Sequence, residues 1–379
     1  MLPLNILITN FCNQNCSFCF ASSEMNNKLI KKEMSLDDFK KTLLKMKKNP
    51  KIKVVKLLGG EPTLHSKFKE IINLSLRYFP YVQIFTNGIF SNDLANFLIT
   101  KTPNVAFTFN VTTPGFLLNP KIRFLVSSRI KQLAKKTNIT LSLTFDMNSD
   151  MSLVFKAIGG KTLSLAHQFR LGFANPIAGE KNSYLFSDFP KMGQQLVSIV
   201  STIRKYNKQC KISLNCGFTR CMFNENQFEY IKKEVEIAGF GCFGKDSSFD
   251  LQTDMKAFHC FPLSTVDKIY TRHKSFTSVN NQLLKKRFSY WAKIRQQVCL
   301  KCPFYGFGED KCPGPCLGFL VNNYDIKKFV NKMRLFFEKH ESVNDYKNIN
   351  FSYENVLFND IFNLIVHISK NLIKRKNES

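Results

Sequence analysis

Residues 4–21 read LNILITNFCNQNCSFCFA and place three cysteines, Cys12, Cys16 and Cys19, directly after an apolar stretch. The apolar stretch predicts a β-strand, so the cysteines are expected on the loop at its carboxyl end, where barrel folds carry their chemistry. A structural zinc site needs four ligands, and the nearest histidine in sequence is His65. Three thiolates on a 4Fe-4S cluster leave one iron open. The spacing therefore favours an iron-sulfur cluster with an open position, and a zinc site or a chance grouping is the alternative.

Composition indicates a globular protein. The chain has 379 residues, of which 44% are hydrophobic and 22% charged, enough for one large domain and a smaller one. It shows no signal-peptide pattern and no apolar run long enough to span a bilayer. A cytoplasmic location without membrane association is expected. In a reducing cytosol, twelve clustered cysteines favour metal ligation over disulfides.

Apolar stretches alternate with amphipathic ones along the first half of the chain. Between the cysteines and the second predicted strand, residues 34–50 predict a helix in which Ser35 and Asp38 have capping-box spacing. A second amphipathic stretch covers residues 123–136. This alternation predicts βαβ units. The predicted strands lie within residues 4–11, 54–58, 81–88, 105–113, 139–146 and 167–176.

The C-x3-C-x2-C spacing, with Phe18 directly before the third cysteine, resembles the hallmark of the radical SAM superfamily. The resemblance implies the α/β class with a partial (β/α)6 TIM-like barrel. It also implies that Cys12, Cys16 and Cys19 are the catalytic ligands of a 4Fe-4S cluster whose open iron binds S-adenosylmethionine (SAM). Such enzymes cleave SAM reductively to a 5′-deoxyadenosyl radical, which abstracts hydrogen from a substrate. An electron donor such as ferredoxin or flavodoxin is then the expected partner.

Strand ends supply further expected SAM contacts. Residues 59–62 read GGEP and resemble the turn that binds the SAM amino group; glycines allow close backbone approach, and the Glu61 carboxylate can accept hydrogen bonds from an ammonium group. Residues 86–88 resemble the family's TNG turn. An ordinary structural role is the alternative for each of these residues. The expected SAM contacts are Phe18, Gly59, Gly60, Glu61, Pro62, Thr86, Asn87, Asn110, Ser142 and Arg170.

Nine further cysteines lie between residues 210 and 316, and Cys210 stands apart from the rest. Eight thiolates are enough for two complete 4Fe-4S clusters. Their pattern resembles the SPASM extension of radical SAM enzymes, with three departures: Met255 replaces the glycine of a G-x4-C element, the gap of nine residues after Cys302 is longer than in the family, and no cysteine follows Cys316. The expected auxiliary ligands are Cys216, Cys221, Cys242, Cys260, Cys299, Cys302, Cys312 and Cys316.

Spacing alone does not tell which four thiolates share a cluster. Cys216 or Cys221 is the candidate for the missing ligand. A single auxiliary cluster is an alternative to two, and a zinc ribbon built from the pairs Cys299/Cys302 and Cys312/Cys316 is another.

Three domains are expected: a radical SAM barrel over 1–207, a small cysteine-rich α+β iron-sulfur domain over 208–320 and a basic helical appendage over 321–379. The net charge is +27, which attracts polyanions or acidic peptides. Nucleic acid is a less favoured partner because no nucleic-acid-binding motif is present. The barrel begins near residue 3, so no separate amino-terminal peptide-recognition domain is expected.

Substrate class follows from the resemblance alone. Enzymes with SPASM-like extensions mostly modify peptides or proteins, which implies maturation of a ribosomally made peptide. One alternative is a radical SAM enzyme that modifies RNA, favoured by the charge. The other is a non-catalytic iron-sulfur or zinc protein that binds nucleic acid, against which the GGEP and TNG turns argue.

Overall fold

The computed structural model describes residues 4–19, 21–26, 30–50, 52–178, 180–215, 217–237, 249–294, 297–306 and 311–322. Cys216 and Cys242 lie outside these ranges, as does nearly all of the expected appendage at 321–379. Among the described helices, none is long and apolar enough to cross a membrane.

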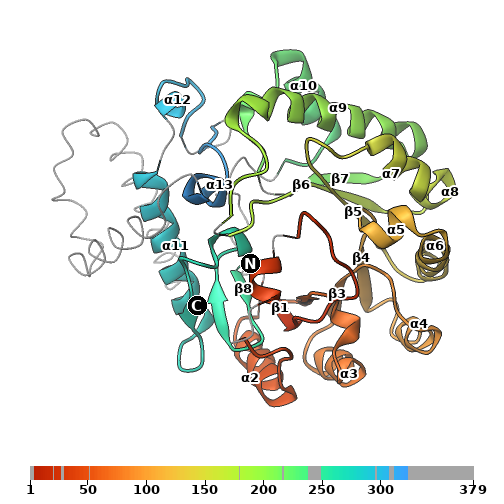
Figure 1. The fold of residues 1–379 in the computed structure, drawn as a ribbon. Helices are drawn as coiled ribbons and strands as arrows, with labels where there is room; N and C mark the ends of the chain where they lie inside the picture. The colour runs from red at the N-terminus through yellow and green to blue at the C-terminus, as the bar shows by residue number, and fades with distance from the viewer. Residues whose placement is uncertain are drawn as a thin grey trace.

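A curved sheet with strand order β10-β9-β8-β1-β2-β3-β4-β5-β6-β7 forms the centre of the molecule (Figure 1). Strands β1 to β7 are parallel, β8 is parallel to β1, and β9 and β10 are antiparallel to their neighbours. All six predicted strands are confirmed, and together with the flanking helices they form the expected TIM-like partial barrel. The strands are β1 (Leu4–Thr9), β2 (Val54–Gly59), β3 (Tyr81–Thr86), β4 (Val105–Asn110), β5 (Ile139–Phe145), β6 (Gln168–Phe173), β7 (Lys211–Leu214), β8 (Phe249–Leu251), β9 (Lys256–Phe258) and β10 (Ile269–Tyr270).

Helices connect the parallel strands and lie along the outer side of the curved sheet (Figure 1). The helix start predicted from this spacing is confirmed, since Ser35 is the N-cap and its Oγ accepts a hydrogen bond from the Asp38 amide at 3.2 Å. Phe39, Leu43 and Met46 of that helix are fully buried against the sheet. The helices of the barrel are α1 (Ser22–Met25), α2 (Leu36–Lys47), α3 (Phe68–Tyr78), α4 (Asn92–Ile99), α5 (Pro114–Leu118), α6 (Pro120–Ala134), α7 (Met151–Ile158), α8 (Gly160–Leu163) and α9 (Phe189–Tyr206).

The sheet continues past the predicted domain boundary at residue 207. Strand β7 pairs with β6, and β8 pairs with β1 at the other side of the barrel. These strands are only four and three residues long, too short to show a period of alternation. The two limits of the cysteine-rich domain stay predictions.

Helix α11 (Phe276–Lys293) lies beside β8, and Cys299, Cys302, Cys312 and Cys316 follow it along the chain (Figure 1). Trp291 on α11 donates its indole N–H to the Pro313 carbonyl at 2.6 Å and stacks on Tyr305. Asn322 donates to the Ile177 carbonyl at 2.8 Å, which ties this region to the loop after β6. The remaining helices are α10 (Glu225–Glu234), α11 (Phe276–Lys293), α12 (Gln297–Leu300) and α13 (Leu317–Asn322), with short 3-10 turns η1 (Pro62–Leu64), η2 (Phe186–Asp188), η3 (Arg220–Met222) and η4 (Phe261–Leu263).

Candidate radical SAM site and auxiliary cysteine site

The loop after β1 carries the first three cysteines over the carboxyl end of the sheet, as predicted. Two side chains between the cysteines fix this loop to its neighbours. Asn13 Nδ2 donates to the Ile89 carbonyl at 3.1 Å, and Gln14 Oε1 accepts from the Gly115 amide at 2.8 Å. The cysteine loop is therefore held to the loops after β3 and β4, which gives its thiols a defined position.

The three thiols lie close enough to influence one another. Burial, together with the neighbouring Cys19 and Cys12 sulfurs, raises the pKa of Cys16 to about 12. Burial also raises the pKa of Cys12 and of Cys19, whereas backbone N–H groups directed at both sulfurs lower it. One of these is the Gln14 amide, 3.4 Å from Cys12 Sγ. Amide donors of this kind stabilise the negative charge of thiolates that hold iron-sulfur clusters.

Gly59 and Gly60 bring the end of β2 against the cysteine loop. A Cβ atom at Gly60 would lie 2.4 Å from the Phe11 carbonyl oxygen and 2.9 Å from Cys12 Cβ. A Cβ atom at Gly59 would lie 2.4 Å from the Thr9 carbonyl oxygen. No side chain fits at these distances, so the glycines are required by the approach of two backbone segments.

The Glu61 carboxylate differs from the sequence expectation. It is 1% exposed, it does not line the cavity beside the cysteines, and both of its oxygens accept hydrogen bonds from the protein. Oε2 accepts from the Asn87 amide at 2.7 Å, and Oε1 accepts from the Thr86 hydroxyl at 2.8 Å and from Thr63. Glu61 therefore links the GGEP turn to the TNG turn. Burial raises its pKa, and these hydrogen bonds act in the opposite direction.

One cavity of about 480 Å³ opens beside the three cysteines and extends into the barrel. This volume lies within the usual range for small-molecule sites. Four predicted SAM contacts, Glu61, Pro62, Thr86 and Ser142, are not among the residues that line it. Thr86 and Ser142 are each 1% exposed. The predicted residues that do line the cavity are Cys12, Cys16, Cys19, Phe18, Gly59, Gly60, Asn87, Asn110 and Arg170.

Several lining residues were not predicted. Gln14 lies inside the cysteine motif, and Lys56 is one of the alternate β2 residues that face the barrel interior. Strand alternation was the available signal for Lys56, because residues 52, 54, 56, 58 and 60 all line the cavity. Asn175 follows β6 and Asn215 follows β7. Asn215 was not predicted because β7 is too short to be recognised in the sequence. The unpredicted polar lining residues are Asn5, Gln14, Lys53, Lys56, Thr112, Thr113, Thr144, Asn175 and Asn215.

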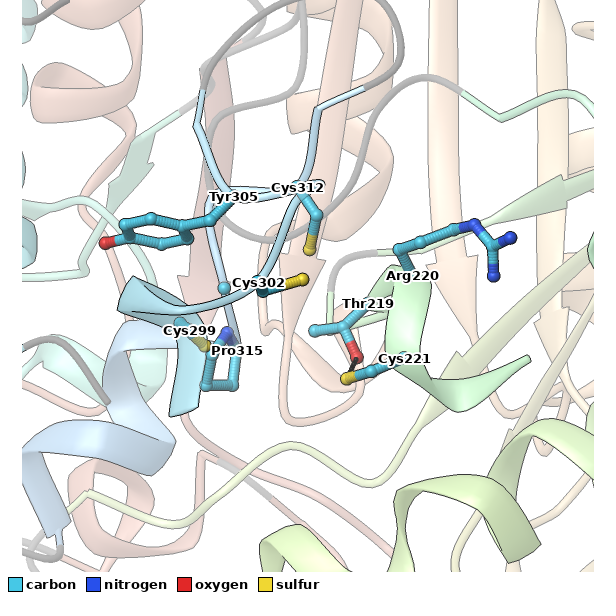
Figure 2. A pocket seen from close by; sticks show the side chains of 9 residues that line it. Thr219, Arg220, Cys221, Cys299, Cys302, Tyr305, Cys312 and Pro315 are labelled. Carbon is cyan, nitrogen blue, oxygen red and sulfur yellow. Dashed lines mark hydrogen bonds between the residues drawn. The ribbon is translucent and has the colours of Figure 1, made fainter. Parts of the chain in front are cut away.

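A second, smaller cavity lies between four of the later cysteines. Figure 2 shows Cys299, Cys302 and Cys312 on one side of it and Cys221 on the other. Cys221 comes from the η3 turn after β7, whereas Cys299 lies in α12 and Cys312 pairs with Tyr305 in an isolated β-bridge. Segments almost eighty residues apart in sequence therefore supply one set of thiols.

The thiols around this cavity also act on one another. Burial, together with the neighbouring Cys221, Cys312 and Cys302 thiols, raises the pKa of Cys299 to about 12. Burial also raises the pKa of Cys312, while the backbone N–H groups of Arg220 and Gly314 lower it. The arrangement combines four thiols with amide donors, as an iron-sulfur site requires.

The zinc-ribbon alternative needs Cys316 beside Cys312, and Cys316 is not among the residues that line this cavity. Within the described ranges, no three His, Cys, Asp or Glu side chains are gathered as ligands of a single metal ion. Cys260 and Cys316 precede η4 and α13, which touch each other, since a Cβ at Gly318 would lie 2.2 Å from Pro262 Cβ. Cys216 and Cys242 lie outside the described residues.

Met255 occupies the position of the glycine in the family's G-x4-C element. Its φ is 67°, in the left-handed region that favours glycine. The side chain is 2% exposed, and the Met255 carbonyl accepts hydrogen bonds from the amide and hydroxyl of Thr271. The backbone thus keeps the glycine conformation, although the sequence departs from glycine.

Comparison with known proteins defines the class of the barrel. Residues 6–162, less than half of the chain, match the model of the Radical SAM superfamily. Over 87 residues the chain is 39% identical to 7,8-dihydro-6-hydroxymethylpterin dimethyltransferase of Methanocaldococcus jannaschii, covering 22% of this chain and 17% of that protein. Over 112 residues it is 30% identical to the sporulation killing factor maturation protein SkfB of Bacillus subtilis, covering 29% of this chain and 26% of that protein. The chain thus spans about a quarter or less of the length of these relatives.

Solved structures extend the similarity of the fold. The crystal structure of Streptococcus suis SuiB bound to precursor peptide SuiA superposes with a TM-score of 0.56 and 16% identity, covering 79% of this chain and 70% of that one. Another SuiB structure contains S-adenosylmethionine. The radical SAM family uses a 4Fe-4S cluster together with SAM, and the grouped thiols around the two cavities fit such clusters.

Proposed function

We propose that this protein is a radical SAM enzyme that modifies a peptide. The observation that carries the proposal is the single cavity that Cys12, Cys16 and Cys19 share with Phe18 and the two glycines of the GGEP turn. Cys12, Cys16 and Cys19 would hold a 4Fe-4S cluster, which would supply an open iron for SAM and, once reduced by an electron donor, the electron for its reductive cleavage to a radical that takes hydrogen from the substrate.

The chain's own residues would hold and orient the reactants. Backbone groups of Gly59 and Gly60 line the cavity and are available to the SAM amino group, whereas the Glu61 carboxylate is engaged by Thr63, Thr86 and Asn87. Asn110 lines the same cavity at the end of β4 and offers amide donors and acceptors, whereas the Asn87 side chain at the end of β3 is bonded to Asn13 and to the Ile89 amide. Phe18 and Phe85 cover apolar parts of the wall, which limits water near a radical.

We assign an auxiliary 4Fe-4S cluster to Cys221, Cys299, Cys302 and Cys312. Cys221 then takes the place of the cysteine that the family has after the position of Cys316. Cys260 and Cys316 are left for a second cluster, with Cys216 and Cys242 as the candidates to complete it. The mutual influence of the four thiols around the smaller cavity supports the first set.

A peptide substrate is favoured over a nucleotide by two features together. The later cysteines are arranged for an auxiliary cluster, and the fold is similar to SuiB over most of the chain. The sequence matches that include "Probable GTP 3',8-cyclase" of Saccharolobus islandicus cover only 24% of this chain. RNA modification remains the alternative that the net charge of +27 favours.

The experiment is SAM cleavage by anaerobically reconstituted protein with dithionite. We expect 5′-deoxyadenosine from the unsubstituted protein and none from a variant in which Cys12, Cys16 and Cys19 are alanine. That variant should keep auxiliary iron with the electron paramagnetic resonance signals of 4Fe-4S centres.

Cys210→Ala provides the matched control, because Cys210 is buried away from both cavities and its thiol donates to the Asn207 carbonyl. Its iron content and SAM cleavage should equal those of the unsubstituted protein. Undiminished cleavage in the triple variant would overturn the proposal, and stoichiometric zinc without iron in that variant would overturn the auxiliary clusters.

A further inference from the structure

The part of the cavity that lies inside the barrel is positively charged. Its lining includes Lys53, Lys56 and Arg170 and, among the described residues, no Asp or Glu. Lys56 lies in the middle of β2, and Arg170 enters from β6, with its guanidinium 5.7 Å from the centre of the Phe85 ring. Two cations from separate strands thus face one space.

One carboxyl group lies directly behind these cations. Asp250 on β8 is 7% exposed and accepts a hydrogen bond from Asn5 Nδ2 at 2.7 Å. Asn5 is paired in register with Lys56 on one side and with Asp250 on the other. Arg170 and Lys56 both lower the pKa of this carboxyl, while burial raises it to about 7. Lys53, Lys56 and Arg170 outnumber this single carboxyl, so this part of the cavity carries a net positive charge.

The remaining polar lining suits a peptide. Asn110, Asn175 and Asn215 present side-chain amides, which pair with backbone amides as donors and acceptors. Thr113 Oγ1 is buried beside the cavity and has no hydrogen-bond partner within the described part of the chain.

We propose that Lys56 and Arg170 bind the carboxylate of an acidic side chain of the peptide substrate, so that Arg170 faces the substrate and not SAM, the contact expected of it from the sequence. The inference rests on the proposed function and adds that the barrel selects a substrate with an acidic side chain. A carboxylate matches the planar guanidinium of Arg170, which can bind it through two parallel N–H donors, and the side-chain amides beside it suit the backbone of a peptide. Binding there would anchor the substrate below the three cysteines, inside the same cavity.

The test compares two probes of equal shape on the SAM-loaded protein under anaerobic conditions. N-acetylglutamate N-methylamide carries the carboxylate, and N-acetylglutamine N-methylamide replaces it with a neutral amide. Titration calorimetry should show about tenfold tighter binding of the glutamate probe, as expected for one charge-assisted contact of about 1.4 kcal/mol. Equal binding of the two probes would overturn the inference without depending on any variant.

Variants assign the effect to the cavity. Lys56→Met should remove most of the preference for the glutamate probe, and Lys56→Arg should keep it. Lys131→Met is the matched control, because Lys131 is exposed on α6 outside the barrel. An unchanged preference in Lys56→Met would overturn the assignment.

Inorganic phosphate is titrated in parallel. Tighter binding of phosphate than of the glutamate probe would overturn the carboxylate in favour of a phosphorylated substrate. SAM cleavage by the unsubstituted protein tests the proposed function separately, so cleavage without probe discrimination overturns this inference alone.

Discussion

Gly60 is the residue at which the β2 turn and the cysteine loop meet. Its α-carbon faces both the Phe11 carbonyl and the side chain of Cys12. A change at this position therefore acts on cluster ligands and on the SAM-facing backbone at once. Cluster binding and SAM binding therefore both depend on this contact.

Gly60→Ala should reduce both iron loading of the first cluster and SAM binding. The added methyl would lie 2.4 Å from a backbone oxygen, so the cysteine loop has to shift. We expect iron content close to that of the variant lacking all three cysteines. Gly160→Ala is the control, because its added Cβ meets only the movable Tyr206 ring at 3.2 Å. Normal iron content in Gly60→Ala would show that the loop accommodates the methyl.

Asp250 should make stability depend on pH. Its pKa is raised by burial to about 7, above the ordinary value of 3.8. The folded state therefore favours the protonated carboxyl, and this contribution to stability is full below pH 3.8 and is lost as the pH rises through 7.

Asp250→Asn, which mimics the neutral form, should become more stable relative to the unsubstituted protein between pH 4 and 7. The measurement is the free energy of unfolding by denaturant at several pH values, with the two proteins compared under identical anaerobic conditions. A difference that stays constant across this range would contradict the raised pKa.

The site was predictable where chemistry fixes residue spacing. The triad, Phe18 and the glycines follow from cluster ligation and close backbone approach, and they line one cavity. The surroundings of Glu61 were not predictable, because a carboxylate in a turn does not reveal whether donors from Thr86 and Asn87 will surround it. Its contact with SAM stays a prediction. Lys56 and Asp250 were missed because their meeting depends on the pairing of β1 with β8.

At the scale of elements, helix α9 determines where Cys221 lies. Gly193 in α9 presses against the backbone of η3, the turn that contains Cys221. A Cβ at Gly193 would be only 1.8 Å from the Met222 carbonyl oxygen. The helix and the turn can therefore approach only where the helix has no side chain.

Gly193→Ala should displace η3 and weaken the auxiliary site. Overpacking of this kind costs about 1–3 kcal/mol of stability, and the shift moves Cys221 from the other three thiols. We expect loss of auxiliary iron, measured in the background that lacks Cys12, Cys16 and Cys19. Full auxiliary iron in this variant would remove Cys221 from the ligand set.

The sequence revealed element type better than element partners. Long periodic segments such as α2 and the strands β1 to β6 were predicted, and Met255 was noticed as a departure whose backbone proves to be glycine-like. Short strands such as β8 carry too few residues for a pattern, and they pair only because distant segments supply neighbours.

At the scale of the whole molecule, β1 is an interior strand only because β8 covers its second side. The hydrogen bond between Asn5 and Asp250 joins residues 245 positions apart. The first cysteine loop therefore follows a strand whose stability depends on the later half of the chain. The barrel and the cysteine-rich region therefore share one sheet through the pairing of β1 with β8.

A fragment containing residues 1–237 should consequently be less soluble than the full chain. Removing β8 leaves β1 as an open edge that can pair with another molecule. Sedimentation of the two proteins at equal concentration, both reconstituted without oxygen, measures the difference. A monomeric fragment with a loaded first cluster would contradict this dependence on β8.

The pairing of β1 with β8 can form only after both strands have been synthesised. During translation at about 5–20 residues per second, β1 would leave the ribosome roughly 12 to 50 seconds before β8 is made. For that time the nascent sheet ends at the strand that leads into Cys12, Cys16 and Cys19. These thiols are therefore most accessible to oxidants and to other metal ions while the chain is still being synthesised. Slower translation should lower the yield of active protein more than slower folding does.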